Sequence, residues 1–262
     1  MEKFKWPTDS CWIDETFDIF KNIDNDFEIE SLSKKIRTGE TWGDRKATTA
    51  IRVFEAIKAR YLKHDRNKVI ALSSVINSSI SKQEKYNHLL IYYLEYENLV
   101  EFFLSNYIFE NLNKYSQKTY TSMDLDRFFE IVLNDYNDYL PDKLQKEISD
   151  KSMNKARNQL WKNIETFGWG EKTENKLIIK RPNLTPEWIT YTLYFYFPEE
   201  SISMKDIYKS DIYKRFLLNE VDLDFLINGA KMKGLLDVQS LGDISTINRK
   251  ERGLSDYARS YK

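Results

Sequence analysis

Residues 89–104 read LLIYYLEYENLVEFFL, which is the most apolar stretch of this 262-residue chain. Glutamates at positions 95, 97 and 101 interrupt it, so it is too polar to be a membrane-spanning helix and is expected to lie in a protein core. Glycine and proline, which supply most turns, number only 8 and 5. We therefore expect a mostly α fold, a multi-helix bundle in which few tight turns occur.

Residues 1–198 are expected to form the helical body, because apolar residues recur at helical spacing through most of this range. One short strand is expected at 176–180, and the aromatic helix after it should be buried. The predicted helices span residues 47–61, 66–78, 82–112 (two helices), 122–139, 149–167 and 188–197.

The body opens with an acidic segment, residues 9–30, whose charges sum to about -7. Its apolar residues Ile13, Phe17, Phe20 and Ile23 recur at helical spacing. This pattern predicts a helical lead-in that packs on the body and keeps a solvated acidic face.

Residues 199–248 are expected to form a winged-helix-like module. Ser203 is placed to cap a helix that runs to about residue 218, and Asp222 to cap a second helix that ends at Gly234. A β-hairpin is expected around Leu241-Gly242-Asp243, and the only other strand is expected near 176–180. The second helix should turn inward Leu223, Phe225, Leu226 and Ala230. The polar tail, 249–262, is expected to fray.

Two helices carry cationic faces that could neutralise successive phosphates. The first follows Asp44, its expected cap, in the most basic stretch of the chain, which sums to +5 over residues 44–68. The cationic face of either helix alone is explained as an ordinary solvent-exposed surface. The two faces together with a winged helix favour binding to nucleic acid. The candidate DNA-binding residues are Arg45, Lys46, Arg52, Arg60 and Lys63 on the first helix, Lys151, Lys155, Arg157 and Lys162 on the second, and Lys231, Lys233, Arg249 and Lys250 near the C-terminus.

The motifs of common catalytic and cofactor sites are missing from the sequence. Two histidines and one cysteine cannot build a His/Cys zinc site, and neither a phosphate-binding glycine loop nor a Ser-His-Asp order occurs. Asp124 and Asp126 fit helix capping better than magnesium binding. His64 is expected in water or at a phosphate, and Cys11 as a small buried hydrophobe. No catalytic residue, metal or cofactor is therefore expected.

The lone cysteine excludes an internal disulfide, and the N-terminal residues MEKFKWPTDSCW lack the apolar stretch of a signal peptide. These features predict a cytoplasmic protein without a membrane partner. The net charge of -1 provides no overall attraction to nucleic acid, so any such binding must come from local surfaces.

The order of these elements resembles the BrxA family of BREX bacteriophage-defence systems over roughly residues 30–200. The similar stretches are WGDRKATTAIRVFEAIKARYL (42–62), LLIYYLEYENLVEFFLSNYIF (89–109), DLDRFFEIVL (124–133), SDKSMNKARNQLWKNIETFGW (149–169) and LIIKRPNLTP (177–186).

The resemblance implies a helical, non-enzymatic accessory protein that binds double-stranded DNA beside other BREX subunits. It offers no catalytic residues to carry over. The alternative is a protein-interaction scaffold whose cationic helices meet acidic partner subunits. A metal-dependent nuclease or toxin is the weakest of the three hypotheses.

Overall fold

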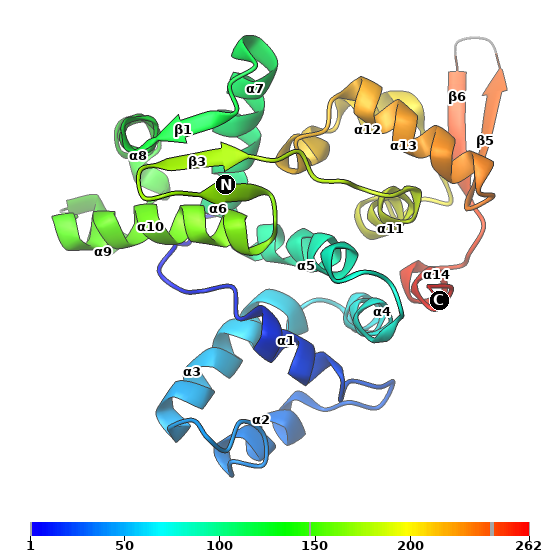
Figure 1. The fold of residues 1–262 in the computed structure, drawn as a ribbon. Helices are drawn as coiled ribbons and strands as arrows, with labels where there is room; N and C mark the ends of the chain where they lie inside the picture. Colours follow the sequence, from blue (N-terminus) through cyan, green and yellow to red (C-terminus); the bar gives the residue numbers. More distant parts are fainter. Residues whose placement is uncertain (1, 147, 242–243, 262) are drawn as a thin grey trace.

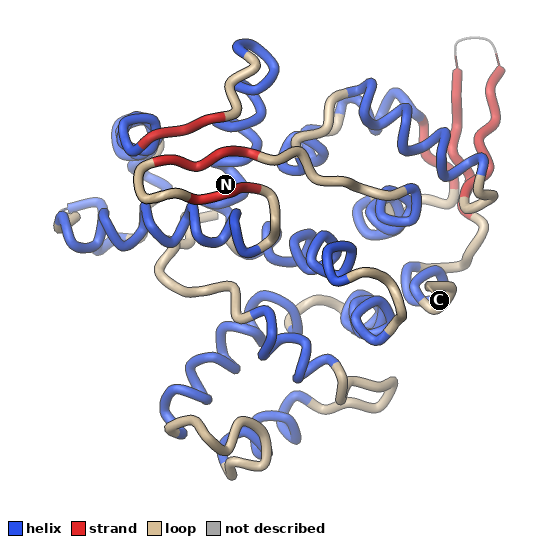
Figure 2. The backbone as a smooth tube through the Cα atoms, viewed as in Figure 1, coloured by secondary structure: helices blue, strands red, loops and turns tan. Residues whose placement is uncertain are grey.

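The computed structural model describes residues 2–146, 148–241 and 244–261, and it is mostly helical, as the sequence predicts. Two small three-stranded antiparallel sheets lie among the helices, and the hairpin of the second sheet extends at one edge of the molecule (Figures 1 and 2). None of the described helices is both long and apolar enough to cross a membrane.

The N-terminal layer holds α1 (Ile13–Phe20), α2 (Ile29–Arg37), α3 (Ala47–Ile57), a π-helical turn η1 (Lys58–Leu62) and α4 (Arg66–Asn77). The prediction that the acidic segment packs on the body is confirmed, because Ile13, Phe20 and Ile23 are buried. The predicted Asp44 cap is wrong. The first residue of α3 is Ala47, and Lys46 at its N-cap makes no side-chain capping bond.

The stretch 89–104 forms the centre of the core. It belongs to α5 (Lys82–Tyr96), α6 (Asn98–Phe102) and a second π-helical turn, η2 (Phe103–Ile108), which continues into α7 (Phe109–Tyr115). A capping box between Ser81 and Glu84 starts α5. Leu89 to Leu94 are all buried, so the expected core role of this stretch is confirmed.

The first sheet has the order β1-β3-β2 and lies beside α8 (Ser122–Asp135) and α10 (Asp150–Thr166) (Figure 1). Strand β3 (Lys176–Ile179) is the predicted one, whereas β1 (Thr119–Thr121) and β2 (Gly170–Lys172) were not predicted. The expectation that strand occurs in only two places is therefore wrong. A strand of three residues is too short to show a period of two. The short elements η3 (Asn137–Tyr139) and α9 (Asp142–Lys146) connect α8 to α10.

Helix α11 (Pro186–Tyr196) is the predicted aromatic helix, and it is buried through most of its length. Thr185 caps it by accepting from the Trp188 backbone N–H at 3.2 Å. Pro186 occupies the first turn, where its missing N–H leaves no intrahelical bond unmade.

Residues 201–249 contain β4 (Ser201–Ser203), α12 (Met204–Lys209), a 3₁₀ helix η4 (Asp211–Phe216), α13 (Glu220–Met232), β5 (Leu236–Leu241) and β6 (Ile244–Arg249). The sheet order is β4-β6-β5, with Ile247 opposite both Ile202 and Val238. The predicted hairpin is confirmed, although residues 242 and 243 of its turn lie outside the described residues.

Three details of this region differ from the prediction. Ser203 caps only α12, because the chain turns at Ser210 into η4 instead of continuing as one helix to residue 218. The N-cap of α13 is Asn219, and Asp222 completes the capping box from the third helical position. Phe225, expected to face inward, is exposed.

The C-terminal tail is ordered against the body, so the prediction that it frays is wrong. It forms α14 (Leu254–Ala258), which packs on α4 and α11. Leu254 and Tyr257 are buried, and the hydroxyls of Tyr257 and Tyr261 both donate to the backbone carbonyl of Glu187. Leu254, Tyr257, Ala258 and Tyr261 recur at the i, i+3, i+4, i+7 spacing of an amphipathic helix, a signal in the sequence that could have predicted this docking.

Candidate nucleic-acid interface

Helix α10 presents a row of three lysines to solvent: Lys151, Lys155 and Lys162, called here the lysine row. Their spacing of four and seven residues places them on one face of an α-helix. The opposite face, which includes Ala156, Leu160 and Ile164, is buried. At 1.5 Å per residue the row is about 16 Å long. None of its lysines takes part in an ion pair within the described part of the chain.

The ends of α10 are fixed by local chemistry that the sequence predicted. Ser149 caps the start by accepting from the Ser152 backbone N–H at 3.3 Å, and Gly168, with φ of 76°, ends it. A left-handed φ of this kind suits glycine because other residues pay a steric cost there. The lysine row therefore sits on a helix of defined length.

Arg157 does not belong to this row. It is half-buried, pairs with Asp126 of α8, and donates to the Asn154 side chain at 3.2 Å. The prediction that Arg157 offers its charge to a ligand is therefore wrong, because the charge is matched by an internal carboxylate. Asp126 is correspondingly part of a helix–helix link, and Asp124 completes the capping box of α8 with Thr121.

The cationic face predicted on α3 is partly lost, because two of its five residues, Arg45 and Arg60, are withdrawn from solvent. Arg45 is half-buried, pairs with Glu15 and lies over the rings of Trp12 and Trp42 at 5.8 Å. Lys46, Arg52 and Lys63 remain exposed, and no ion pair of theirs occurs among the described residues. Helices α3 and α10 lie apart in Figure 1, so the structure does not merge their cations into one row.

Arg60 is the clearest error of the sequence prediction, because its exposed fraction is only 2%. Arg60 follows the buried Val53 by seven residues and the buried Ile57 by three, so the α-helical period itself places it beside the inner face of α3. The prediction of an outer position counted Arg60 with the basic residues around it and overlooked this spacing. Residues 58–62 form a π-helical turn that continues α3, and within it Arg60 points into the protein.

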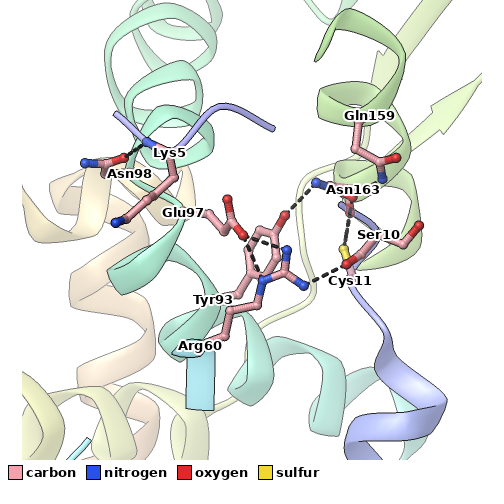
Figure 3. Close-up of polar contacts among 9 residues, drawn as sticks. All are labelled: Lys5, Ser10, Cys11, Arg60, Tyr93, Glu97, Asn98, Gln159 and Asn163. Carbon is pink, nitrogen blue, oxygen red and sulfur yellow. Dashed lines mark hydrogen bonds and ion pairs between the residues drawn. The ribbon is translucent and has the colours of Figure 1, made fainter. Parts of the chain in front are cut away.

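Inside the protein, Arg60 is the centre of a polar network (Figure 3). Its Nε donates to Glu97 Oε1 at 2.8 Å, and its Nη1 donates to the Ser10 carbonyl at 2.7 Å. The guanidinium also lies 5.1 Å from the centre of the Tyr93 ring. Asn163 continues the network by donating to the Tyr93 hydroxyl at 2.5 Å and accepting from Cys11 Sγ at 3.2 Å.

The electrostatics of this network are those of a structural ion pair. Burial opposes the charge of Arg60 and is the largest single effect, but Glu97 together with Tyr93, Tyr61 and Cys11 outweighs it and raises the Arg60 pKa. Burial also raises the pKa of Glu97, and Arg60 opposes that rise. Burial raises the pKa of Cys11 to about 12, so its thiol stays protonated at neutral pH and is a poor nucleophile. The expectation that Cys11 is a small buried residue is confirmed.

Both histidines are packed among aromatic rings. His64 lies edge-on to Tyr92 at 5.0 Å between ring centres, and burial lowers its pKa. The prediction that it lies in water or at a phosphate is wrong. His88 is fully buried between the Glu84 carbonyl and the Tyr261 hydroxyl. Within the described residues, no group of three or more His, Cys, Asp or Glu side chains could hold a metal ion.

The C-terminal candidates separate into two kinds. Lys231 and Lys250 are exposed, whereas Lys233 pairs with Glu187 at 2.8 Å. Arg249 is half-buried and donates to the carbonyls of Leu193 and Pro198, at the C-terminal end of α11. Such a position is favourable for a cation because the negative end of the helix dipole lies there. Arg249 therefore binds the backbone at the C-terminal end of α11, and its side chain is not free to contact DNA.

The sequence prediction missed an apolar surface on α13. Val221, Phe225 and Met232 are called here the apolar row, and 75%, 79% and 88% of their surfaces are exposed. Helical spacing could have found the row, since Leu223, Leu226, Ile227 and Ala230 by themselves complete an inward face. Large apolar residues opposite such a face have no place in the core.

Three comparisons with known proteins bear on identity. No family model matches this chain, and neither does any curated protein or solved structure. The assignment of function therefore rests on the chain's own residues.

Proposed function

We propose that this chain is a non-enzymatic accessory protein that binds double-stranded DNA through the lysine row of α10, as expected of a BREX-type defence component. The observation that carries the proposal is the row itself: three exposed lysines, without internal ion pairs among the described residues, on one face of a capped helix. The membership in phage defence rests only on the sequence resemblance to the BrxA family.

The chemistry of the row suits the backbone of a duplex. DNA carries one phosphate per 3.4 Å on each strand, so a row about 16 Å long spans the rise of roughly five base pairs. Asn154 and Asn158 are exposed next to the lysines and can donate further hydrogen bonds. Contacts of this kind position a protein on DNA without reading bases, so weak sequence preference is expected.

Residues 199–248 are proposed to be a winged-helix-type module. The order of β4, α12, α13 and the β5–β6 hairpin supports this, as does the pairing of β4 with β6. Its second helix, α13, is unsuited to phosphates, because its first turns carry Glu220, Asp222 and Asp224 and its outer face is apolar. The module is therefore proposed to bind protein and not DNA.

The test is a titration of a labelled duplex of about 20 base pairs with two matched triple variants. Lys151→Glu/Lys155→Glu/Lys162→Glu reverses the lysine row. Lys118→Glu/Lys205→Glu/Lys209→Glu reverses three other exposed lysines and changes the net charge equally. We expect the first variant to lose at least tenfold more affinity than the second, with both retaining the helical far-UV spectrum.

The protein-interaction scaffold remains the second candidate, favoured by the apolar row of α13. Its test uses the same two triple variants and the α13 variant Phe225→Glu. Each chain is purified with its neighbouring defence subunits. DNA affinity that is equal in both triple variants, together with co-purification lost only when α13 is altered, would replace the DNA proposal by the scaffold.

A further inference from the structure

The apolar row of α13 is a single stripe. Steps of four and seven residues keep Val221, Phe225 and Met232 within a narrow sector of the helix, and the inward face packs on α11 and β5. Scattered exposed apolar residues are common, whereas three large ones aligned on one side of a helix are typical of an interface. Helix α13 lies at the outside of the molecule (Figure 1).

A shallow groove of about 340 Å³ adjoins the N-terminal half of the row. Its apolar lining comes from the segment before α11, from Leu218 just before α13, and from α13 itself. The lining includes Pro182, Leu184, Leu218, Val221 and Phe225. The surface therefore combines the protruding side chains of the apolar row with a depression beside its N-terminal half.

The charges beside the row are divided along the helix. Glu220 and Asp224 lie on one edge of the row in its N-terminal half, and Lys231 lies on the same edge in its C-terminal half, by the 100° rotation per residue. All three are exposed, and no ion pair of Glu220 or Lys231 occurs within the residues that the structure describes. A uniformly charged partner would be repelled at one end of this edge.

We propose that the occupant of this surface is a second copy of the same chain, bound through an antiparallel pair of α13 helices related by a two-fold axis. Such an axis brings the same edge of both helices together and reverses one of them. With Val221 level with Met232 of the second copy, Lys231 of that copy lies level with residue 222, between Glu220 and Asp224. The acidic half of this edge therefore faces the basic half of the same edge in the second copy.

The same register explains the groove. Met232 of the second copy, the most exposed residue of the row, lies at the level of Val221, which lines the depression. Phe225 lies level with Asn228 of the second copy, next to the axis. Because α13 has only 13 residues, the buried area falls at the low end for specific interfaces, and association is expected at micromolar concentrations.

Sedimentation equilibrium over a range of concentrations tests the proposal. The wild-type mass is expected to rise from 31.3 kDa towards twice that value. Phe225→Glu should raise the dissociation constant at least tenfold. Tyr115→Glu, at an equally exposed aromatic residue on α7, should leave it unchanged. A wild-type chain that stays monomeric to about 100 μM would overturn the proposal, as would a dimer indifferent to Phe225→Glu.

A charge exchange tests the register and does not depend on apolar packing. Glu220→Lys and Lys231→Glu should each weaken self-association, because both place like charges together across the two-fold. Mixing the two variants should restore association to near the wild-type level, since each Lys–Glu pair is then re-formed. Mixed variants that stay as weakly associated as the separate ones would refute the antiparallel arrangement.

Discussion

At the scale of single residues, burial decides what each charged or polar group does. Arg60 lies in a basic stretch and yet faces Glu97 inside the protein. Helical spacing could have found this position, because Arg60 follows the buried Val53 by seven residues and the buried Ile57 by three. The burial of Cys11 could likewise be predicted, because a lone cysteine beside aromatic residues is usually buried.

Removing one partner of the Arg60–Glu97 pair is expected to destabilise the fold strongly. Arg60→Met leaves the Glu97 carboxylate buried without a counter-charge, which costs about 3–5 kcal/mol of the free energy of unfolding. Urea unfolding measures this loss. Arg52→Ala, at an exposed arginine of α3, should change stability by less than about 0.5 kcal/mol.

A double variant separates the ion pair from simple packing. Arg60→Met/Glu97→Leu removes both charges, so it should recover most of the stability lost in Arg60→Met. Equal instability of the single and double variants would show that the unpaired carboxylate is not the cause.

His88 is expected to make stability depend on pH. Burial lowers its pKa to about 4, from an ordinary value of 6.5. Below pH 6.5 the unfolded chain therefore binds a proton that the folded chain does not, and stability falls as the pH drops towards 4. The full effect is about 3 kcal/mol.

The measurement compares urea midpoints of wild type and His88→Gln from pH 4 to pH 7.5. The amide keeps hydrogen-bonding groups towards Glu84 and Tyr261 but does not titrate. The wild type should lose more stability than the variant on acidification, and parallel pH profiles would contradict the assignment to His88.

At the scale of secondary-structure elements, a helix was predictable where its end signals and its period agree. Helix α10 has both, with Ser149 at its start and Gly168 after its end, and its lysine row follows directly from the spacing. Strands β1 and β2 have three residues each, and their pairing with β3 is a tertiary contact that no local pattern encodes. Helix α14, by contrast, was predictable from the helical spacing of Leu254, Tyr257, Ala258 and Tyr261.

The docking of α14 gives a test of the C-terminal structure. Leu254→Ala removes a buried side chain and should lower the free energy of unfolding by at least about 2 kcal/mol. Glu251→Ala, three residues earlier and exposed, should have little effect. Thermal and urea unfolding that cannot distinguish the Leu254 variant from wild type would mean that the tail is frayed after all.

At the scale of the whole molecule, the net charge does not reveal which local surfaces are strongly charged. The chain carries 40 basic and 41 acidic residues, so its average gives no indication of a ligand. The sequence could identify the basic segments but not which cations are neutralised internally, because Glu15, Asp126 and Glu187 reach Arg45, Arg157 and Lys233 from distant segments. Only the tertiary fold separates the free lysine row from these pairs.

The most direct test of DNA binding through α10 is the salt dependence of duplex affinity. Wild type and Lys151→Gln/Lys155→Gln/Lys162→Gln are titrated between about 50 and 200 mM salt. Each lost phosphate contact reduces the slope of log affinity against log salt by about 0.9, so the variant slope should be shallower by roughly 2.7. Equal slopes for the two proteins would contradict the claim that the lysine row contacts DNA.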